Sequence, residues 1–359
     1  MKSFNEVFED KTKYGTKIKT SEYCEMGAHL IIDQGQEQVA GYTDIEEGVF
    51  EEVPVIIFGG HTRVIKYVDK PFFLGADGVK VLRSKFKNAN YKYLYYALKN
   101  ARIPNTGYNR HFKWLKEVQI EYPDYRRQEN VVKILDKVSD LIETRQHEIK
   151  RLDDLIKARF VELFGDPVSN SYGLPEATLP DLGEFGRGVS KHRPRNDIKL
   201  LGGKYPLIQT GDVANAGLYI ISYSSTYSEL GLKQSKMWDK GTLCITIAAN
   251  IAKTAILEFD ACFPDSVVGF IANERTNNIF VHYWFSFFQA ILESQAPESA
   301  QKNINLKILS ELKVIVPEKR KQDQFASFVK LTDKSKVAVQ KALDEAQLLF
   351  DSLMQEYFG

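Results

Sequence analysis

Basic and hydrogen-bonding side chains are concentrated in one stretch, residues 186–199, which reads GRGVSKHRPRNDIK. Guanidinium, ammonium and imidazole groups placed among turn-forming residues can contact phosphates and the edges of nucleic-acid bases. The same stretch could instead be a solvated surface loop that happens to be basic. The candidate contact residues in it are Arg187, Lys191, His192, Arg193 and Arg195.

Two further pairs of polar residues follow apolar segments that resemble strands. Gln209 and Thr210 end one such segment, just before a glycine. Asn250 and Lys253 follow another, TLCITIA. Amide, hydroxyl and ammonium groups at strand ends can enter a groove and bond to base edges. Both pairs are therefore candidates for base contact, and a role in loop structure is the alternative.

The first half of the chain has comparable positions. Gln34 and Gln36 follow the apolar segment HLIID, and FGGHTR at 58–63 presents a second set of polar side chains after the apolar PVIIF. The two glycines could form a phosphate cradle, but the remaining glycines and the lysine of a P-loop are missing. Close approach to a DNA backbone or a plain tight turn fits them better. The candidate residues of this segment are His61, Thr62 and Arg63.

One polar cluster occurs in both halves of the chain. Asn109 and Arg110 lie in it after a glycine, and Lys302 and Asn303 lie at the matching place further on. Because the cluster recurs, a shared structural or phosphate-binding role is favoured over the reading of a particular base sequence.

Catalytic signatures are missing from the sequence. An adenine methyltransferase needs an Asn/Asp-Pro-Pro-aromatic motif, and the chain has no Pro-Pro pair. Its six histidines show no HExxH or other metal spacing, and its three cysteines are scattered, so they are interpreted as buried thiols. We therefore expect no catalytic centre, no metal and no cofactor on this chain.

Composition sets further bounds. The 359 residues suit two or three domains, and a hydrophobic fraction of 43% with 26% charged residues is typical of a globular protein. There is no membrane-length apolar run and no secretory signal, so a cytoplasmic protein is expected. The net charge of +1 means that any DNA affinity must come from local patches or from a basic partner.

The chain repeats itself. A gapless shift of 194 residues carries Leu115 onto Leu309 and Pro123 onto Pro317, and it continues to Gly359, the last residue. Weaker matches extend the repeat into the globular parts, among them GAHLIIDQG with GKYPLIQTG, FLGADGV with FPDSVVG, and YKYLYYAL with VHYWFSFF. The pattern indicates a tandem duplication with diverged loops.

Each repeat ends in a long helix. LKEVQIEYP at 115–123 and LSELKVIVP at 309–317 alternate like strands that stop at proline, and roughly 38 residues without Gly or Pro follow each of them. Apolar residues recur every seventh position, which predicts that the two helices pack as a coiled coil. The predicted seam contains Leu135, Ile142, Ile149, Ile156, Leu163, Val329, Leu343, Phe350 and Tyr357.

Three basic residues interrupt this seam: Arg145, Arg159 and Lys336. They could mark the register of the helix pair. Alternatively, they extend along their aliphatic stems to solvent, which is the interpretation that we favour.

These features resemble the specificity subunits of type I restriction-modification enzymes over essentially the whole chain. The resemblance is carried by KARFVELFGDP at 157–167, by the helix entrances IEYPDYRRQEN and VIVPEKRKQDQ, and by LPDLGEFGRGVSKHRP with YPLIQTGDV in the second half. No single motif is decisive, but their order and duplication are specific to this architecture.

The resemblance implies a mixed α/β fold with pseudo-twofold symmetry. Two target-recognition domains, 1–123 and 166–317, would be separated by an antiparallel coiled coil of a central helix, 124–165, and a C-terminal helix, 318–359. Each domain would read one half of a bipartite DNA target. Two modification subunits, carrying S-adenosylmethionine and the methylation chemistry, would dock on the helices, and restriction subunits would join them.

The rival hypothesis is a tandem-domain scaffold that bridges protein partners through its coiled coil and does not bind DNA. The near-neutral charge favours it slightly. Salt-dependent DNA binding by the complex with modification subunits would separate the two hypotheses.

Overall fold

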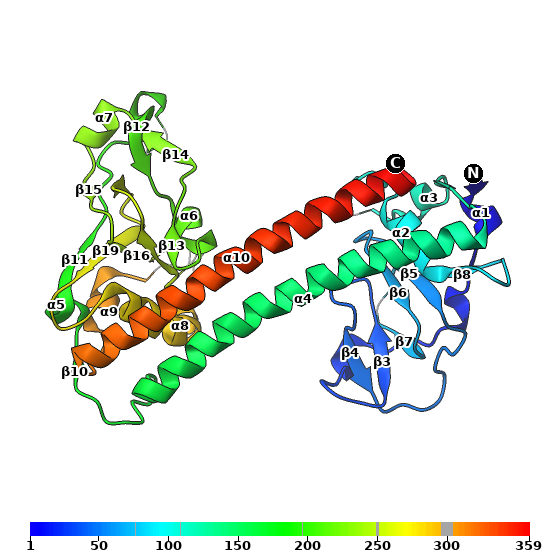
Figure 1. Ribbon diagram of the computed structural model, residues 1–359, viewed down its shortest axis with the longest axis horizontal. Helices are drawn as coiled ribbons and strands as arrows, with labels where there is room; N and C mark the ends of the chain where they lie inside the picture. The colour runs from blue at the N-terminus through cyan, green and yellow to red at the C-terminus, as the bar shows by residue number, and fades with distance from the viewer. Residues whose placement is uncertain (76, 108, 196, 249–250, 296–303) are drawn as a thin grey trace. The chain divides into compact units, whose positions relative to one another are not determined.

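The structure is a computed structural model that describes residues 1–75, 77–107, 109–195, 197–248, 251–295 and 304–359 (Figure 1). The chain forms two compact units. The first unit comprises Met1–Gln146 and Lys341–Gly359, and the second comprises His147–Gln340. Each unit holds one mixed α/β domain and one half of each of the two long helices, α4 (Tyr125–Phe164) and α10 (Lys319–Phe358).

The domain of the first unit is built on two sheets. A four-stranded antiparallel sheet has the order β2-β8-β5-β6, and a three-stranded sheet has the order β4-β3-β7, in which β3 and β7 are parallel. The strand VIIFG of β5 is fully buried because both faces of its sheet are covered. The strands are β1 (Lys2–Ser3), β2 (Phe8–Asp10), β3 (His29–Ile32), β4 (Gly41–Thr43), β5 (Val55–Gly59), β6 (Ile65–Val68), β7 (Phe72–Leu74), β8 (Val79–Ser84) and β9 (Gln119–Ile120). The helices are α1 (Phe4–Val7), η1 (Thr12–Tyr14), η2 (Thr20–Glu22), α2 (Tyr91–Lys99) and α3 (Phe112–Leu115).

The domain of the second unit has a similar plan. Its five-stranded sheet has the order β11-β19-β16-β17-β13, and its four-stranded sheet has the order β14-β12-β18-β15 with β12 and β18 parallel. The strands are β10 (Glu176–Ala177), β11 (Gly183–Arg187), β12 (Leu201–Leu207), β13 (Tyr219–Ile220), β14 (Ser225–Tyr227), β15 (Met237–Trp238), β16 (Leu243–Thr246), β17 (Thr254–Leu257), β18 (Ala261–Cys262), β19 (Val267–Ala272) and β20 (Val314–Ile315). The helices are α5 (Leu179–Leu182), η3 (Ile198–Leu200), α6 (Thr210–Asn215), α7 (Glu229–Lys233), α8 (Asn278–Gln295) and α9 (Leu306–Glu311).

The two domains share one topology, which confirms the predicted duplication. The order β2-β8-β5-β6 corresponds to β11-β19-β16-β17, and the parallel pair β3 and β7 corresponds to β12 and β18. The aromatic segments matched in the sequence form nearly all of α2 and the central part of α8. The turn from β7 to β8 is therefore the counterpart of the turn from β18 to β19.

The strands predicted at 115–123 and 309–317 are largely wrong. Leu115 ends the short helix α3 and Leu309 lies in α9, so only the two-residue strands β9 and β20 remain. Both leucines are fully buried in the cores of their domains. These leucines are apolar because they are buried in short helices. The alternating pattern that predicted strands does not reflect strand structure at these positions.

The predicted long helices and their pairing are confirmed. Each has 40 residues, which is about 60 Å at 1.5 Å per residue. In the first unit, Leu135 near the start of α4 shares a core with Phe350 near the end of α10. In the second unit, Ile156 near the end of α4 shares a core with Phe325 and Val329 near the start of α10. The pair is therefore antiparallel.

The predicted seam residues all lie on the less exposed side of these helices. Leu135, Ile156 and Val329 are fully buried, and Phe350 is 7% exposed. The others are partly buried, namely Ile142, Ile149, Leu163, Leu343 and Tyr357.

The basic residues that interrupt the seam behave differently from one another. The Lys336 ammonium lies 2.6 Å from the Asp153 carboxylate of the other helix, and its side chain is only 23% exposed. Arg159 instead pairs with Glu162 on its own helix at 2.7 Å. The solvent interpretation is therefore wrong for Lys336, which bridges the two helices and can mark their register.

The glutamine that follows each proline by five residues fixes the helix start. Gln128 donates from Nε2 to the Pro123 carbonyl oxygen at 2.8 Å, and Gln322 makes the same bond to Pro317 at 2.8 Å. Gln322 also donates to the Arg275 carbonyl oxygen at 3.0 Å and accepts from the Thr276 hydroxyl at 2.8 Å. The repeated Pro and Gln are thus a structural device.

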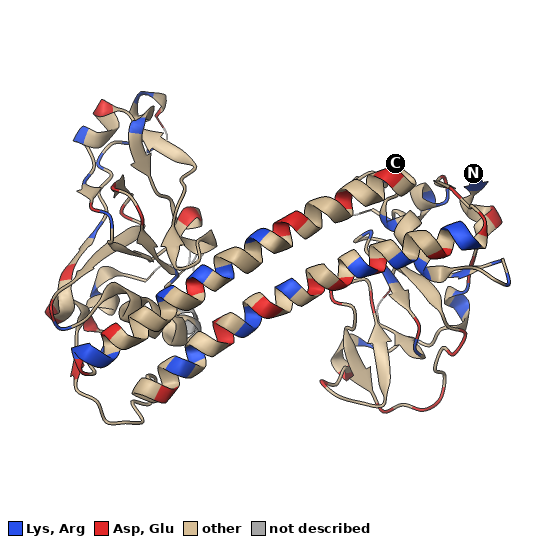
Figure 2. Ribbon diagram, viewed as in Figure 1, with Lys and Arg blue, Asp and Glu red and all other residues tan. Residues whose placement is uncertain are grey.

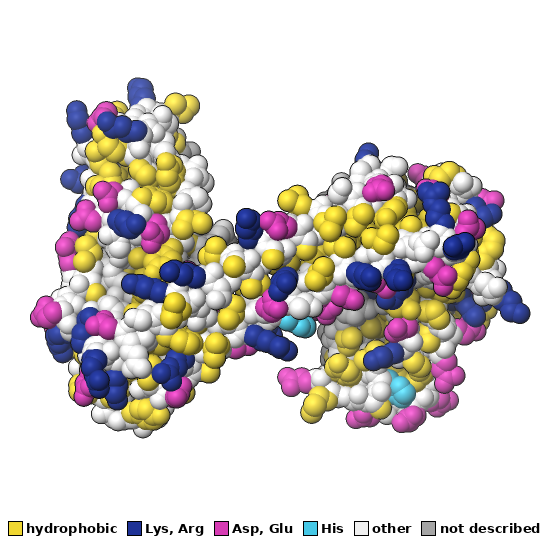
Figure 3. Space-filling view, in the orientation of Figure 1, with side chains coloured by type: hydrophobic (Ala, Val, Ile, Leu, Met, Phe, Trp, Pro, Cys, Tyr) yellow, Lys and Arg dark blue, Asp and Glu magenta, His cyan; other side chains and the backbone are white. Residues whose placement is uncertain are grey.

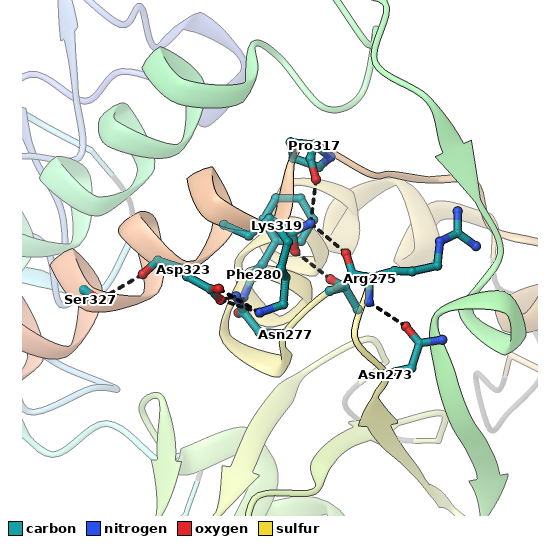
Figure 4. Close-up of polar contacts among 10 residues, drawn as sticks. Asn273, Arg275, Asn277, Phe280, Pro317, Lys319, Asp323 and Ser327 are labelled. Carbon is teal, nitrogen blue, oxygen red and sulfur yellow. Dashed lines mark hydrogen bonds and ion pairs between the residues drawn. The ribbon is translucent and has the colours of Figure 1, made fainter.

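An exposed ion pair reinforces the start of α10, as Figure 4 shows. The Lys319 ammonium lies 2.6 Å from the Asp323 carboxylate, and Asn277 donates to the same carboxylate at 3.1 Å. Because Asn277 directly precedes α8, these contacts join α10 to the domain of the second unit.

We expect Gln322→Ala to destabilise the protein more than Gln128→Ala does. Losing Gln322 leaves several buried partners unpaired and should lower the free energy of unfolding by roughly 2–4 kcal/mol, against about 1 kcal/mol for Gln128. Urea unfolding measures the difference when it is followed by the fluorescence of Trp114 in the first unit and of Trp238 and Trp284 in the second, with variants that keep the tryptophans of one unit only. An equal or larger loss for Gln128→Ala would contradict the structural account.

Candidate nucleic-acid interface

In the first unit, one glutamine joins three loops at the end of the sheets. Gln34 donates from Nε2 to the Asp77 carbonyl oxygen at 3.1 Å, and its Oε1 accepts the backbone N–H of His61 at 3.2 Å. The Thr62 hydroxyl in turn donates to the Gln34 carbonyl oxygen at 2.6 Å. The structure thus brings Gln34, His61 and Thr62 together, and it uses both ends of the Gln34 amide inside the protein.

A fourth loop, containing the recurring polar cluster, closes onto the same place. His111 is fully buried, and its backbone N–H donates to the Gly60 carbonyl oxygen at 2.7 Å. Asn109 donates to the Thr106 carbonyl oxygen at 2.6 Å, while Arg110 is exposed. A side chain at Gly60 would meet the Gly78 carbonyl oxygen at 2.7 Å, so the glycine permits a close turn. A tight turn therefore explains this glycine.

Arg63 is held in an unusual backbone conformation, with φ of 63°, and its guanidinium donates to the Ile103 carbonyl oxygen at 3.2 Å. It lines an open hollow of about 520 Å³ together with Gln36, Thr62 and Lys99. Three residues predicted from sequence thus line one depression, together with apolar residues such as Ile65 and Leu98.

A buried lysine that sequence reasoning missed supports this end of the first unit. Lys66 is 3% exposed; its ammonium donates to the Glu37 carbonyl oxygen at 2.5 Å and lies 3.5 Å from the Asp33 carboxylate. Burial lowers the pKa of Lys66, and the nearby acidic group partly offsets that shift. Lys66 therefore braces the Gln36 loop, and its place in the strand IKYV carried no sequence signal for this role.

In the second unit, a glycine and a glutamine anchor the basic loop. The Gly188 N–H donates to the Val267 carbonyl oxygen at 2.8 Å, and a side chain there would come within 2.2 Å of the Phe263 carbonyl oxygen. The backbone N–H groups of Lys191 and His192 both donate to Gln234 Oε1, at 2.7 and 3.0 Å. The backbone of the loop is therefore held at Gly188, Lys191 and His192.

The two arginines of this loop meet one carboxylate. Arg195 lies 2.6 Å from Asp265, and Arg193 lies 3.7 Å from it. Arg193 also donates to the Ser190 carbonyl oxygen at 2.7 Å. His192 lies 3.1 Å from Asp197 within the same loop. Sequence reasoning found the basic residues and missed Asp265, although FPDSVVG was recognised as a repeated segment.

The other candidates of the second unit lie on separate elements. Arg187 is exposed at the end of β11, and Gln209 with Thr210 begins α6. Lys253 and His282 line a hollow of about 270 Å³. Burial lowers the pKa of His282 to about 4. The remaining candidates, Asn250, Lys302 and Asn303, lie outside the described residues.

Charge is distributed rather than concentrated. Figure 2 shows basic and acidic side chains interspersed along both long helices, so neither helix is a basic stripe. Within the part of the chain that the structure describes, no group of three or more His, Cys, Asp or Glu side chains could hold a metal ion. None of the described helices is both long and apolar enough to span a bilayer.

The fold is a tandem of two α/β domains that share a topology, each with polar side chains on its loops. The family model of the type I restriction modification DNA specificity domain matches residues 1–153 and again residues 176–346. The chain belongs to this family, which confirms the resemblance found in the sequence.

The chain is also similar to proteins with known names or structures. The putative type I restriction enzyme MjaX specificity subunit of Methanocaldococcus jannaschii is 22% identical over 295 residues, which cover 76% of this chain and 68% of that protein. A crystal structure of the type-I restriction-modification system S subunit from M. genitalium is similar over 100% of this chain and 95% of its own, with 19% identity and a TM-score of 0.61. The HsdS subunit of Thermoanaerobacter tengcongensis is 14% identical with a TM-score of 0.44, covering 99% of this chain and 95% of its own.

Proposed function

We propose that this chain is the DNA specificity subunit of a type I restriction-modification complex and that each domain reads one half of a bipartite target. The observation that carries the proposal is the specificity domain itself, which occurs twice with unlike loop residues on one shared topology. We assign residues 1–123 and 166–317 to target recognition, and 124–165 and 318–359 to the helices that join and space the two domains.

In the first domain, Gln36 and Arg110 are exposed candidates on the loops, and Arg63 lines the adjoining hollow. These are the groups that we assign to DNA contact. Gln34 and Asn109 are assigned to positioning, because their amides bond within the protein. Within the recurring cluster, Asn109 thus supports its loop rather than reading a base.

In the second domain, the exposed loop residues Lys191, Arg193 and Arg195 are assigned to DNA contact. Arginine can bond bidentately to guanine, and lysine can neutralise a phosphate. Ile198, between these basic residues and Lys199, is 88% exposed, and an apolar side chain in this position can pack against a thymine methyl group or a base step.

The long helices carry apolar side chains beyond those of the seam. On α4, Ile134, Leu141 and Leu155 are 40%, 49% and 48% exposed and are separated by one and two heptads. On α10, Leu331 and Leu348 are 66% and 70% exposed. Figure 3 shows such side chains in yellow over the helices of the first unit. We assign these side chains to the docking of two modification subunits, because exposed apolar rows on a helix pair favour partner helices.

The assembly divides the chemistry between its subunits. S-adenosylmethionine and the adenine methylation chemistry belong to the modification subunits, and DNA cleavage belongs to the restriction subunits. This chain supplies recognition and geometry and has no catalytic role of its own. The second candidate function, a scaffold without DNA contact, is favoured by the net charge of +1 and by the exposed apolar rows.

Salt-dependent DNA binding tests the proposal. The chain assembled with its modification subunits should bind duplex DNA that contains its target far more tightly than the chain alone, by a factor of about 100 or more. Several phosphates must be neutralised for tight binding, and the logarithm of affinity falls by about 0.9 per contact for each tenfold rise in salt. The target is first identified by sequencing methylated adenines in a host that expresses the complex.

Two results would count against this account. Absence of any preferred sequence in the methylated DNA, with an intact complex, would favour the scaffold function. Tight and specific binding by the chain alone would show that the partner contributes little of the DNA surface.

A further inference from the structure

Asp265 is placed by a turn that has little freedom. The turn connects β18 to β19, and the Val267 N–H donates to the Pro264 carbonyl oxygen at 3.0 Å. Phe263, Pro264 and Val267 are buried, whereas the Asp265 side chain is 33% exposed. The carboxylate is thus presented at the surface from a rigid base.

The basic loop reaches this carboxylate because its backbone is attached nearby. Gly188 lies against the Phe263 and Pro264 carbonyl oxygens, where a side chain would come within 2.2 and 2.5 Å of them. From there the loop turns back so that Arg195 lies 2.6 Å and Arg193 lies 3.7 Å from Asp265. Both the loop and the turn are therefore held independently of the ion pairs.

The two guanidinium groups are only partly used by the carboxylate. Their side chains remain 47% exposed for Arg195 and 55% exposed for Arg193. A guanidinium has five N–H donors and a carboxylate takes at most two of them in a fork, so the others can bond to a base or a phosphate. An arginine held in this way loses less conformational entropy when it binds.

The first domain has an acidic residue in the corresponding turn. Asp77 lies between β7 and β8, and its carboxylate is 2.5 Å from the Lys17 ammonium. The pKa of Asp77 is lowered mainly by this hydrogen bond, with a smaller contribution from the charge of Arg110. The same turn therefore carries a carboxylate among basic side chains in both copies, although the segments have diverged.

We infer that Asp265 is a positioning residue for target recognition: it orients Arg193 and Arg195 toward one half-site and weakens their attraction to DNA of any sequence. The inference rests on the proposed function. Asp265 itself does not contact DNA. Its negative charge repels phosphates, so its contribution is to discrimination between sequences rather than to affinity.

The test is Asp265→Asn in the complex with modification subunits, measured on duplexes that carry the target or a mismatch in either half. Discrimination at one half-site should fall about tenfold or more, since the arginines lose the orientation that a bidentate contact to a base needs. Binding to unrelated DNA should rise a few-fold and depend more steeply on salt, because the arginines become available to phosphates. Discrimination at the other half-site should not change.

Glu258→Gln is the matched control, because it removes one carboxylate from an ion pair of the same unit, 2.8 Å from Lys240. Glu258 follows the end of β17, and the antiparallel register of β17, β16 and β19 places it at the opposite end of the sheet from Asp265. It should change neither discrimination nor the salt dependence. Arg195→Lys is the second variant; it keeps the charge but loses the fork, so discrimination should fall while the salt dependence stays the same.

Three outcomes are decisive. A wild-type complex without any sequence preference would overturn the proposed function, and the inference with it. If the wild-type complex and the Asp265→Asn variant discriminate equally well between target and mismatched DNA, the inference alone is overturned. Equal losses on target and unrelated DNA would also overturn it, since they would show a general structural role.

Discussion

Replacing Leu141 and Leu331 with glutamate should release this chain from its modification subunits. The Leu141 side chain is 49% exposed and the Leu331 side chain is 66% exposed. Because neither is part of a core, each helix should stay folded when they are replaced. In a complex, each new carboxylate would be buried against apolar partner side chains. Such a change costs roughly 2–4 kcal/mol per site, and every 1.4 kcal/mol is tenfold in affinity. Together the two substitutions should weaken docking by about 1,000-fold or more.

Copurification of tagged chain with modification subunits measures the loss, and methylation of host DNA should disappear with it. Lys150→Glu is the matched control. Lys150 is exposed and lies on the same helix as Leu141. The two residues are nine positions apart, or two and a half helical turns, so Lys150 lies on the opposite side of the helix. Full assembly of the double variant, with methylation retained, would show that the exposed apolar rows of α4 and α10 are not the docking surface.

Lengthening both long helices by one heptad should widen the gap between the two half-sites. The insertions follow Arg145 and Val339, next to the boundaries between the two compact units, and seven residues preserve the seam. Each helix grows by about 10 Å at 1.5 Å per residue. With about 3.4 Å of DNA axis per base pair, the gap should increase by up to about three pairs. Methylation should also slow, because those pairs rotate the second half-site about the DNA axis.

Sequencing of methylated host DNA gives the new motif directly. The bases read in each half should be unchanged, since the insertions lie outside both domains. A second variant combines the same two heptad insertions with the substitutions Arg193→Ala and Arg195→Ala. It should keep the wider gap and lose its base preference in one half-site only. Recovery of the original gap, or of altered bases in the heptad variant, would show that the helices dock partners without setting the spacing.

The amino-acid sequence by itself determined the duplication, the two long helices and the family. These properties depend on local periodicity: an apolar residue every seventh position and a run without Gly or Pro predict a paired helix wherever it lies. The repeated Pro and Gln at each helix start could be recognised in the sequence. Their hydrogen bonds, from Gln322 to Pro317 and to Arg275, became clear only in the structure.

The second row of apolar residues on α4 escaped the sequence analysis. Ile134, Leu141 and Leu155 have heptad spacing, but each lies directly before a seam residue, and Glu148 interrupts the row. In the sequence they read as part of one broad apolar stripe. Only the burial of Leu135 beside the exposure of Ile134 separates the seam from the free row.

The tertiary structure alone decided which polar residues face outward. Gln34, predicted to contact DNA, has its amide bonded to Asp77 and His61, residues 43 and 27 positions away. Asp265, which carried no motif, lies 70 positions from Arg195 and holds it. Loop side chains have no period that reports their direction, and their partners are brought to them by the pairing of distant strands, β3 with β7 and β12 with β18. For that reason the sequence located the loops, and the fold determined the role of each residue within them.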